Sequence, residues 1–206
     1  MLTELRRLAL LTTTAVLGAG LLLWSPTAGA QAPIPTAPTA PNFAGLSTAA
    51  NALAGRLEED LVPLRQRARI VDQATAHGLP ASVGLAVWAE ARRVDLDPWL
   101  VVRVIQVESG WNPGEVSSTG AVGLMQLAPD TWPWLARVTG IQGADPRDPA
   151  QNIRMGTWYL AYLRRQHGSW DAALTAYNRG EQGLRTWVVS RGTSRSGYSD
   201  AITGRR

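Results

Sequence analysis

Apolar residues recur at three- and four-residue steps along much of the chain after Thr48, the spacing of one face of an α-helix. The first such segment, residues 53–71, contains Pro63 and is followed by His77-Gly78, so we expect helical structure interrupted at the proline. Two interpretations remain open for it: a pair of helices that dock on the domain, or a coiled-coil seam for a partner, which Pro63 would break. No stretch alternates apolar and polar residues for long, and the pattern therefore predicts a mainly α domain.

The later helices are marked by residues that favour helix ends. Asp97-Pro98 and Asp148-Pro149 each place a capping side chain before a first-turn proline, and Gly140 and Gly168 follow two of the apolar segments. Residues 192–206 are rich in Gly, Ser, Thr and Arg, and we expect them to form a frayed, flexible basic tail. The predicted helices span residues 80–94, 98–109, 130–139, 149–167, 169–177 and 181–191.

The first 30 residues have the features of a secretory signal. Arg6 and Arg7 precede an apolar stretch over residues 8–24, and Ala28-Gly29-Ala30 resembles a cleavage site. An uncleaved membrane anchor is the alternative, although the stretch is short for a spanning helix. We expect a signal peptide (1–30), a Pro/Thr/Ala-rich linker (31–47), an N-terminal helical segment (48–95), the main domain (96–191) and the tail (192–206), with contact to the membrane only through the signal.

Composition removes several classes of chemistry. The 206 residues include no Cys and no Lys, and only two His, so disulfides, thiolate sites, Schiff-base lysines and a protein-only metal cage are not expected. We assign no metal and no cofactor. Nine Trp and a net charge of +4 suit a partner that is anionic and offers flat faces, such as a glycan or a nucleic acid.

Glu108 is the strongest catalytic candidate. It lies near the end of the predicted helix over residues 98–109, which is otherwise almost wholly apolar, and it precedes a Gly/Ser-rich loop. Partial burial would raise the pKa of its carboxyl group, as a general acid near neutral pH requires. A carboxylate that simply turns to solvent at a helix end is the alternative, and composition alone leaves both open.

Two segments resemble the conserved blocks of the soluble lytic transglycosylase family, to which goose-type lysozymes are more distantly related. They are ESGWNPGEVSSTGAVGLMQLAP (108–129) and NIRMGTWYLAYLRRQHGSWDAALTAYNRGEQGLRTW (152–187). The resemblance implies a lysozyme-like, mostly helical fold, in which a small β element around residues 116–127 is allowed. It also implies cleavage of the β-1,4 bond between N-acetylmuramic acid and N-acetylglucosamine, which leaves a 1,6-anhydro end.

The resemblance carries individual residues with it. Glu108 matches the family's single catalytic acid, and the matched substrate-binding positions are Ser117, Gly123, Leu124, Met125, Gln126, Tyr177 and Asn178. Taken singly, Ser117 could be a turn former, Met125 and Tyr177 core residues, and Asn178 the end of a helix. The sequence also departs from the family, because Arg179 and Glu181 stand where small residues are usual.

The resemblance therefore implies a peptidoglycan lytic transglycosylase of the periplasm or the extracellular cell wall, with glycan strands as substrate and a cell-envelope protein as a further partner. Three alternatives remain. A hydrolytic muramidase would need a second carboxylate, for which Glu115 and Asp130 are nearest in sequence. A glycan-binding module without turnover would have little reason to retain Glu108. Nucleic-acid binding is suggested by 11 Arg against 5 acidic residues in 137–206, but no recognised motif supports it, and we expect no nucleic-acid partner.

Overall fold

A computed structural model describes residues 43–205 of the chain. Residues 44–206 form one compact unit by their internal contacts. The predicted signal peptide and the linker up to residue 42 lie outside the described residues. Within residues 43–205, no helix combines the length and the apolar character needed to cross a membrane.

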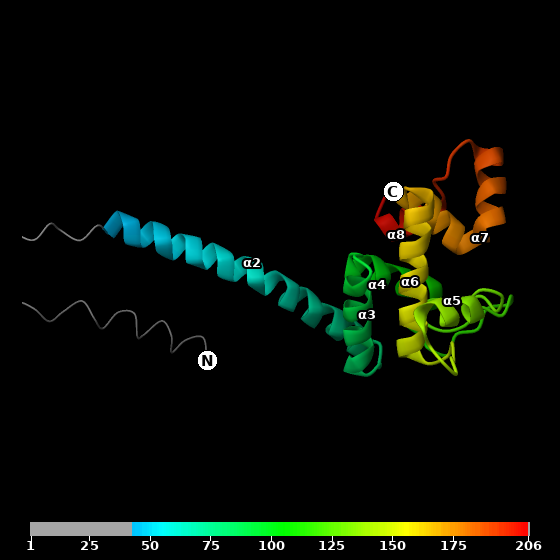
Figure 1. Ribbon diagram of the computed structural model, residues 1–206, viewed down its shortest axis with the longest axis horizontal. Coiled ribbons are helices and arrows are strands. Elements are labelled where there is room, and N and C mark those ends of the chain that lie inside the picture. Colours follow the sequence, from blue (N-terminus) through cyan, green and yellow to red (C-terminus); the bar gives the residue numbers. More distant parts are fainter. Residues whose placement is uncertain (1–42, 206) are drawn as a thin grey trace, which may run out of the picture. The chain divides into compact units, whose positions relative to one another are not determined.

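The described residues contain seven α-helices and almost no β structure, which confirms the mainly α prediction (Figure 1). Between α4 and α5 the chain forms only two isolated antiparallel bridges, Val116 to Val122 and Val122 to Leu127. The helices are α2 (Phe43–Ala76), α3 (Ala81–Arg93), α4 (Pro98–Ser109), α5 (Trp132–Thr139), α6 (Pro149–His167), α7 (Trp170–Arg191) and α8 (Gly197–Thr203).

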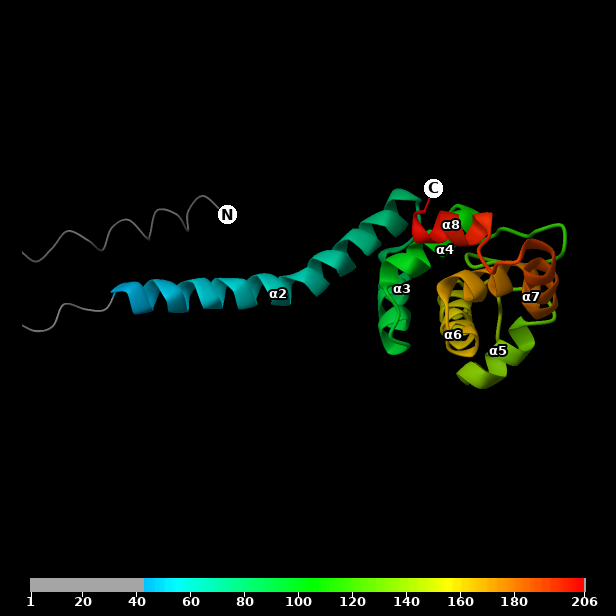
Figure 2. The ribbon, with the colours of Figure 1, turned by 90° about the horizontal axis from the view of Figure 1, so that it is seen from above.

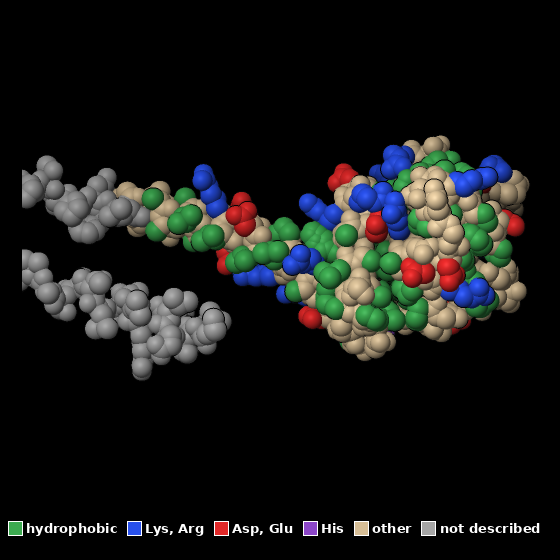
Figure 3. Space-filling view, turned by 60° about the horizontal axis from the view of Figure 1, so that its bottom comes forward, with side chains coloured by type: hydrophobic (Ala, Val, Ile, Leu, Met, Phe, Trp, Pro, Cys, Tyr) green, Lys and Arg blue, Asp and Glu red, His purple; other side chains and the backbone are tan. Residues whose placement is uncertain are grey.

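Helix α2 continues through Pro63, so the predicted interruption and the docked pair of helices are wrong. Proline removes the hydrogen bond to the carbonyl of Glu59, but this part of the helix is exposed and water can hydrate that group. Figure 2 shows a bend in the middle of α2. Leu53, Leu57 and Leu64 remain more than half exposed, and green side chains are visible along this helix in Figure 3. The helix also begins at Phe43, inside the predicted linker.

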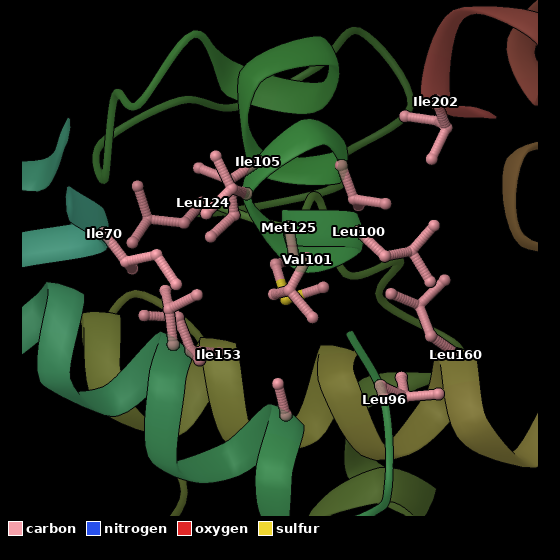
Figure 4. Close-up of a cluster of buried hydrophobic side chains, with 14 of the residues drawn as sticks. Ile70, Leu96, Leu100, Val101, Ile105, Leu124, Met125, Ile153, Leu160 and Ile202 are labelled. Atoms are coloured by element: carbon pink, nitrogen blue, oxygen red, sulfur yellow. The ribbon is translucent and has the colours of Figure 1, made fainter. Parts of the chain in front are cut away.

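The main core forms around α4 and α6. Helix α6 contacts α3, α5 and α7, while α4 contacts α3 and α8. Apolar side chains of α4 converge with Ile70 of α2, Leu124 and Met125 of the α4–α5 loop, and Ile202 of α8 (Figure 4). Helix α3 therefore belongs to the same compact unit as residues 96–191, although the sequence suggested a boundary after residue 95.

The C-terminal residues are folded, and the predicted frayed tail is wrong. Residues 197–203 form α8, whose Ile202 is fully buried in the core next to α4 (Figure 2). Ser196 caps α8 in a reciprocal pair with Ser199, and its hydroxyl also lies 2.8 Å from that of Thr175 in α7. The Arg103 Nε of α4 donates to the Ile202 carbonyl at 2.5 Å. Burial and capping of this short helix outweigh its polar composition.

Candidate active site

Glu108 lies in the last turn of α4, where its side chain lines a cavity. Asp97 caps the start of this helix by accepting from the Trp99 N–H at 3.0 Å. At the other end, the Ser109 hydroxyl donates to the carbonyls of Ile105 and Leu124, at 3.2 and 2.9 Å. The serine after Glu108 thus ties the helix end to the following loop, which holds the carboxylate in place.

The carboxyl group of Glu108 is partly buried and has a specific partner. Burial raises the pKa of Glu108 above its usual value, and a hydrogen bond from Tyr198 lowers the pKa by a smaller amount. The Tyr198 hydroxyl of α8 donates to Glu108 Oε1 at 2.5 Å. The pKa of Tyr198 lies well above its usual value because its hydroxyl is buried beside the carboxylate, so this hydroxyl remains a proton donor. A raised pKa makes this carboxyl group a better proton donor than an exposed glutamate, as general acid catalysis requires.

Two further tyrosines lie on the same side of the molecule. Tyr177 of α7 donates through its hydroxyl to the Met125 carbonyl at 2.7 Å, and its ring centroid is 5.5 Å from that of Tyr159 in α6. Burial, and next the charge of Glu108, hold the pKa of Tyr177 well above its usual value. Tyr177 therefore joins α7 to the loop after α4 as well as facing the site.

The loop between α4 and α5 contributes Ser117 and Gln126. Ser117 closes a turn, because its hydroxyl accepts from the Ala121 N–H at 3.0 Å. Gln126 adopts φ 47°, a left-handed conformation that is uncommon for a residue with a side chain. Its amide nitrogen donates to the carbonyls of Gly123 and Glu115, at 3.0 and 3.2 Å. This fixes the side chain and leaves the amide oxygen as an acceptor for a ligand.

Gly123, Leu124 and Met125, which the resemblance placed among the substrate-binding positions, lie beneath the site and outside the lining of its cavity. Leu124 and Met125 are 0% exposed because they fill the core between α4 and α6. Gly123 has φ +80°, and a Cβ there would lie 2.4 Å from Asn152 Nδ2. Asn152 is itself buried, accepts from the Met125 N–H at 2.8 Å and donates to the carbonyls of Val122 and Pro146.

The remaining predicted residues surround one cavity of about 430 Å³. Glu108, Ser117, Gln126, Tyr177 and Asn178 all line it. Within the described part of the chain, Glu108 is the only carboxylate in this lining and Arg179 is the only basic side chain. No tryptophan of residues 43–205 lines the cavity. Trp132 and Trp134 of α5 and Trp158 of α6 instead pack together in a separate apolar cluster. The cavity combines one acid with hydroxyl and amide groups, which suits a polyhydroxylated ligand.

The structure adds residues that the sequence did not indicate. Tyr198 is the most important, and it was missed because residues 192–206 were expected to fray. The spacing of Ser196 and Ser199 before the apolar Ile202 was a signal for a capped helix. Tyr198 contacts Glu108 from outside the cavity lining. The lining itself adds Thr119, Ala121, Leu127, Ala128, Thr131, Tyr159, Arg179 and Gly180.

Glu115 and Asp130, the acids considered as a second catalytic carboxylate, lie outside this lining, and so does Glu181. Glu115 accepts from the Asn112 amide at 2.8 Å, and Glu181 lies 3.0 Å from His167 Nε2. Asp130 is exposed just before α5. Among residues 43–205, no group of three or more His, Asp or Glu side chains is arranged to hold a metal ion.

A family model described as "Transglycosylase SLT domain" matches residues 86–197. A "Transglycosylase" of Enterobacteria phage PRD1 is 40% identical over 94 residues, which are 46% of this chain and 33% of that protein. The "Soluble lytic murein transglycosylase" of Escherichia coli strain K12 is 39% identical over 90 residues, covering 41% of this chain and 14% of that protein. A solved structure of an inactive mutant of lytic transglycosylase Slt from Pseudomonas aeruginosa has a TM-score of 0.48 and 30% identity, over 57% of this chain and 19% of that one. This chain therefore spans a third or less of the length of these relatives.

Proposed function

This chain belongs to the transglycosylase SLT domain family, and we propose that it is a peptidoglycan lytic transglycosylase in which Glu108 is the single catalytic acid and base. One observation carries the proposal. The cavity that holds Ser117, Gln126, Tyr177 and Asn178 contains one carboxylate in the described residues, and burial raises the pKa of that carboxylate. Hydrolysis by two carboxylates needs a second one across the substrate, about 5–9.5 Å away.

The reaction divides into two proton transfers at Glu108. The protonated carboxyl group first gives its proton to the glycosidic oxygen, and the bond from that oxygen to the anomeric carbon breaks. The developing positive charge is stabilised by the substrate's own N-acetyl group. The Glu108 carboxylate then removes the proton from the 6-hydroxyl group of the same sugar, whose oxygen closes onto the anomeric carbon. No water is consumed, and the carboxyl group is protonated again for the next cycle.

The other residues around Glu108 have defined tasks in this scheme. Tyr198 holds the carboxylate through its hydroxyl group, so that Glu108 keeps one orientation between the two proton transfers. The Gln126 amide oxygen and the Ser117 and Asn178 side chains are the proposed partners for sugar hydroxyl and acetamido groups. The Tyr177 hydroxyl, bound to the Met125 carbonyl, orients its oxygen lone pairs for the cation.

The test is the mass of the products from purified peptidoglycan. Wild-type digests are expected to contain muropeptides one water lighter than their reducing counterparts. Glu108→Gln keeps the size of the side chain but has no proton to give, and turnover should fall by at least ~10²–10⁴-fold. Products with reducing ends alone would establish the hydrolase instead, and full activity of Glu108→Gln would remove this residue from the mechanism.

Export of the chain is part of the same proposal. Residues 1–30 would direct the protein out of the cytoplasm and be removed after Ala30, which would leave the Pro/Thr/Ala-rich residues 31–42 as the N-terminal segment that leads into α2. The substrate would be met in the periplasm or the extracellular cell wall. Mass spectrometry of the exported protein should give an N-terminus at Gln31, whereas a membrane-bound product that retains residues 1–24 would contradict it.

A further inference from the structure

Arg179 lines the same cavity as Glu108 and contributes a positive charge to it. It lies in α7 directly after Tyr177 and Asn178 and before Gly180, where φ 72° and ψ 168° interrupt the helix. Only glycine adopts this conformation readily, and the interruption lets residues 178–180 line the cavity.

The Arg179 guanidinium is held by an aromatic ring. Its central carbon lies 4.1 Å from the ring centroid of Trp187, which belongs to the part of α7 that follows the interruption at Gly180. The indole is fixed in turn, because Trp187 Nε1 donates to the Arg195 carbonyl at 3.0 Å. Stacking uses the face of a guanidinium and leaves its five N–H donors in the plane, ready for an oxyanion. The side chain therefore loses less freedom when it binds a ligand.

The charge of Arg179 is not neutralised by the described part of the protein. In residues 43–205, Arg179 forms no ion pair and no side-chain hydrogen bond. The same holds for Arg191, whose central guanidinium carbon lies 5.1 Å from the Trp187 ring centroid. Other arginines nearby are engaged: Arg195 with Asp200 at 2.7 Å, and Arg185 with Gln182. Two positive groups thus converge on one indole at the edge of the cavity, which attracts an anion.

We propose that Arg179, stacked on Trp187, is a binding subsite for a carboxylate of the peptide stems on the glycan strand. This rests on the proposed function, which places the glycan in the cavity. Stem peptides are attached to every second sugar of such a strand and end in carboxylates, and a guanidinium binds a carboxylate through two parallel hydrogen bonds. Phosphate groups of wall polymers offer the same oxyanion chemistry, and the experiment separates these two sources.

The experiment compares two forms of the same glycan strands. Phosphate-free strands with intact stems are one substrate. The other is the same strands with their carboxylates converted to methylamides, which removes the negative charges and leaves the glycan unchanged. For Arg179→Ala, kcat/KM on the native strands should fall by ~10-fold or more, as expected for charge-assisted hydrogen bonds. On the amidated strands the variant and the wild type should be equal. Arg179→Lys keeps the charge but not the planar guanidinium group, so its kcat/KM on the native strands should lie between those of the wild type and Arg179→Ala.

Arg165→Ala is the matched control, since it removes the same charge from an exposed arginine outside the cavity lining. It should leave the preference for native strands unchanged, and melting curves should show that all variants are folded. Equal losses of Arg179→Ala on both substrates would make Arg179 a structural residue and overturn the proposal. Strands that retain their phosphate polymers are the third substrate. If Arg179→Ala loses activity only on these strands and not on the phosphate-free ones, the anion is phosphate and the proposal is overturned as well.

Failure of the proposed function is detected separately. Binding of inactive Glu108→Gln to the two forms of the strands, measured by calorimetry, tests the Arg179 subsite without turnover. If wild-type products carry only reducing ends while Glu108→Gln still prefers the carboxylate form through Arg179, the reaction type is wrong and the subsite stands. Equal affinity for both forms would remove the subsite whatever the reaction is.

Discussion

Tyr198→Phe is expected to shift the basic limb of the pH–activity profile to higher pH. The Tyr198 hydroxyl donates to Glu108 Oε1 at 2.5 Å, and a donor of this kind stabilises the carboxylate more than the carboxylic acid. It therefore lowers the pKa of Glu108 against the larger, opposing effect of burial. Phenylalanine removes the donor and leaves the burial, so the pKa of Glu108 rises further and the acid stays protonated at higher pH.

The size of the shift follows from the free energy of the bond. A hydrogen bond to a charged group contributes about 1.5–3 kcal/mol. Each 1.36 kcal/mol of preference between the two protonation states corresponds to one pH unit. The basic limb of kcat/KM should thus move up by about 1–2 pH units. The maximal rate should fall at the same time, because Glu108 loses the contact that fixes its orientation.

The assay is kcat/KM for release of anhydro ends from soluble glycan strands, measured from pH 5 to pH 9 for wild type and variant. Tyr177→Phe is the matched control, since its hydroxyl donates to a backbone carbonyl, that of Met125, at 2.7 Å. It can lower the rate but should leave the basic limb in place. A Tyr198→Phe limb that coincides with the wild type, or moves to lower pH, would refute the assignment of Tyr198 as the group that tunes Glu108.

Two further predictions concern stability. The pKa of Glu108 is higher in the folded state than its unfolded value of 4.5, so between these two pKa values the folded state binds more protons than the unfolded state. The stability of the wild type therefore falls as pH rises through this range. Glu108→Gln cannot lose stability in this way, so the Tm of the variant relative to that of the wild type should increase from about pH 4.5 upward and then level off. A pH-independent difference in Tm would contradict this. Asn152→Ala removes hydrogen bonds from three buried backbone groups and should cost about 2–5 kcal/mol in denaturant unfolding. The exposed Asn51→Ala is its control and should change stability by less than ~0.5 kcal/mol.

The helix that carries Glu108 could be predicted from local chemistry. Asp97 and Pro98 specify its start, and the structure ends α4 at Ser109, as expected. Helix α6 was equally well marked by Asp148 and Gly168. These elements were predictable because capping and helix termination act within a few residues of sequence. Helix α2 was not, because the effect of Pro63 depends on whether the freed carbonyl group is buried or hydrated.

The residues of the site were harder to predict, because they are brought together from distant parts of the sequence. The partner of Glu108 lies 90 residues further along the chain, and no local pattern connects the two residues. The matched motif over residues 123–126 combines residues of two kinds. Gln126 faces the cavity, whereas Met125 fills the core and offers only its backbone carbonyl to Tyr177. A sequence motif shows which residues occur together, but only packing decides which of them a ligand can reach.

The loop after Glu108 stores backbone strain next to the reacting carboxylate. Two of the three residues in 43–205 that have positive φ without being glycine, Trp111 at 69° and Gln126 at 47°, lie in this loop. Such conformations cost about 1–3 kcal/mol each and persist only where the surroundings fix them. Trp111 is 2% exposed and stacked on His77, and the backbone next to Gln126 is held by the buried Asn152. Burial at the base of the loop therefore supports a strained, fixed arrangement at its surface, so that the groups facing the cavity need little reorganisation when substrate binds.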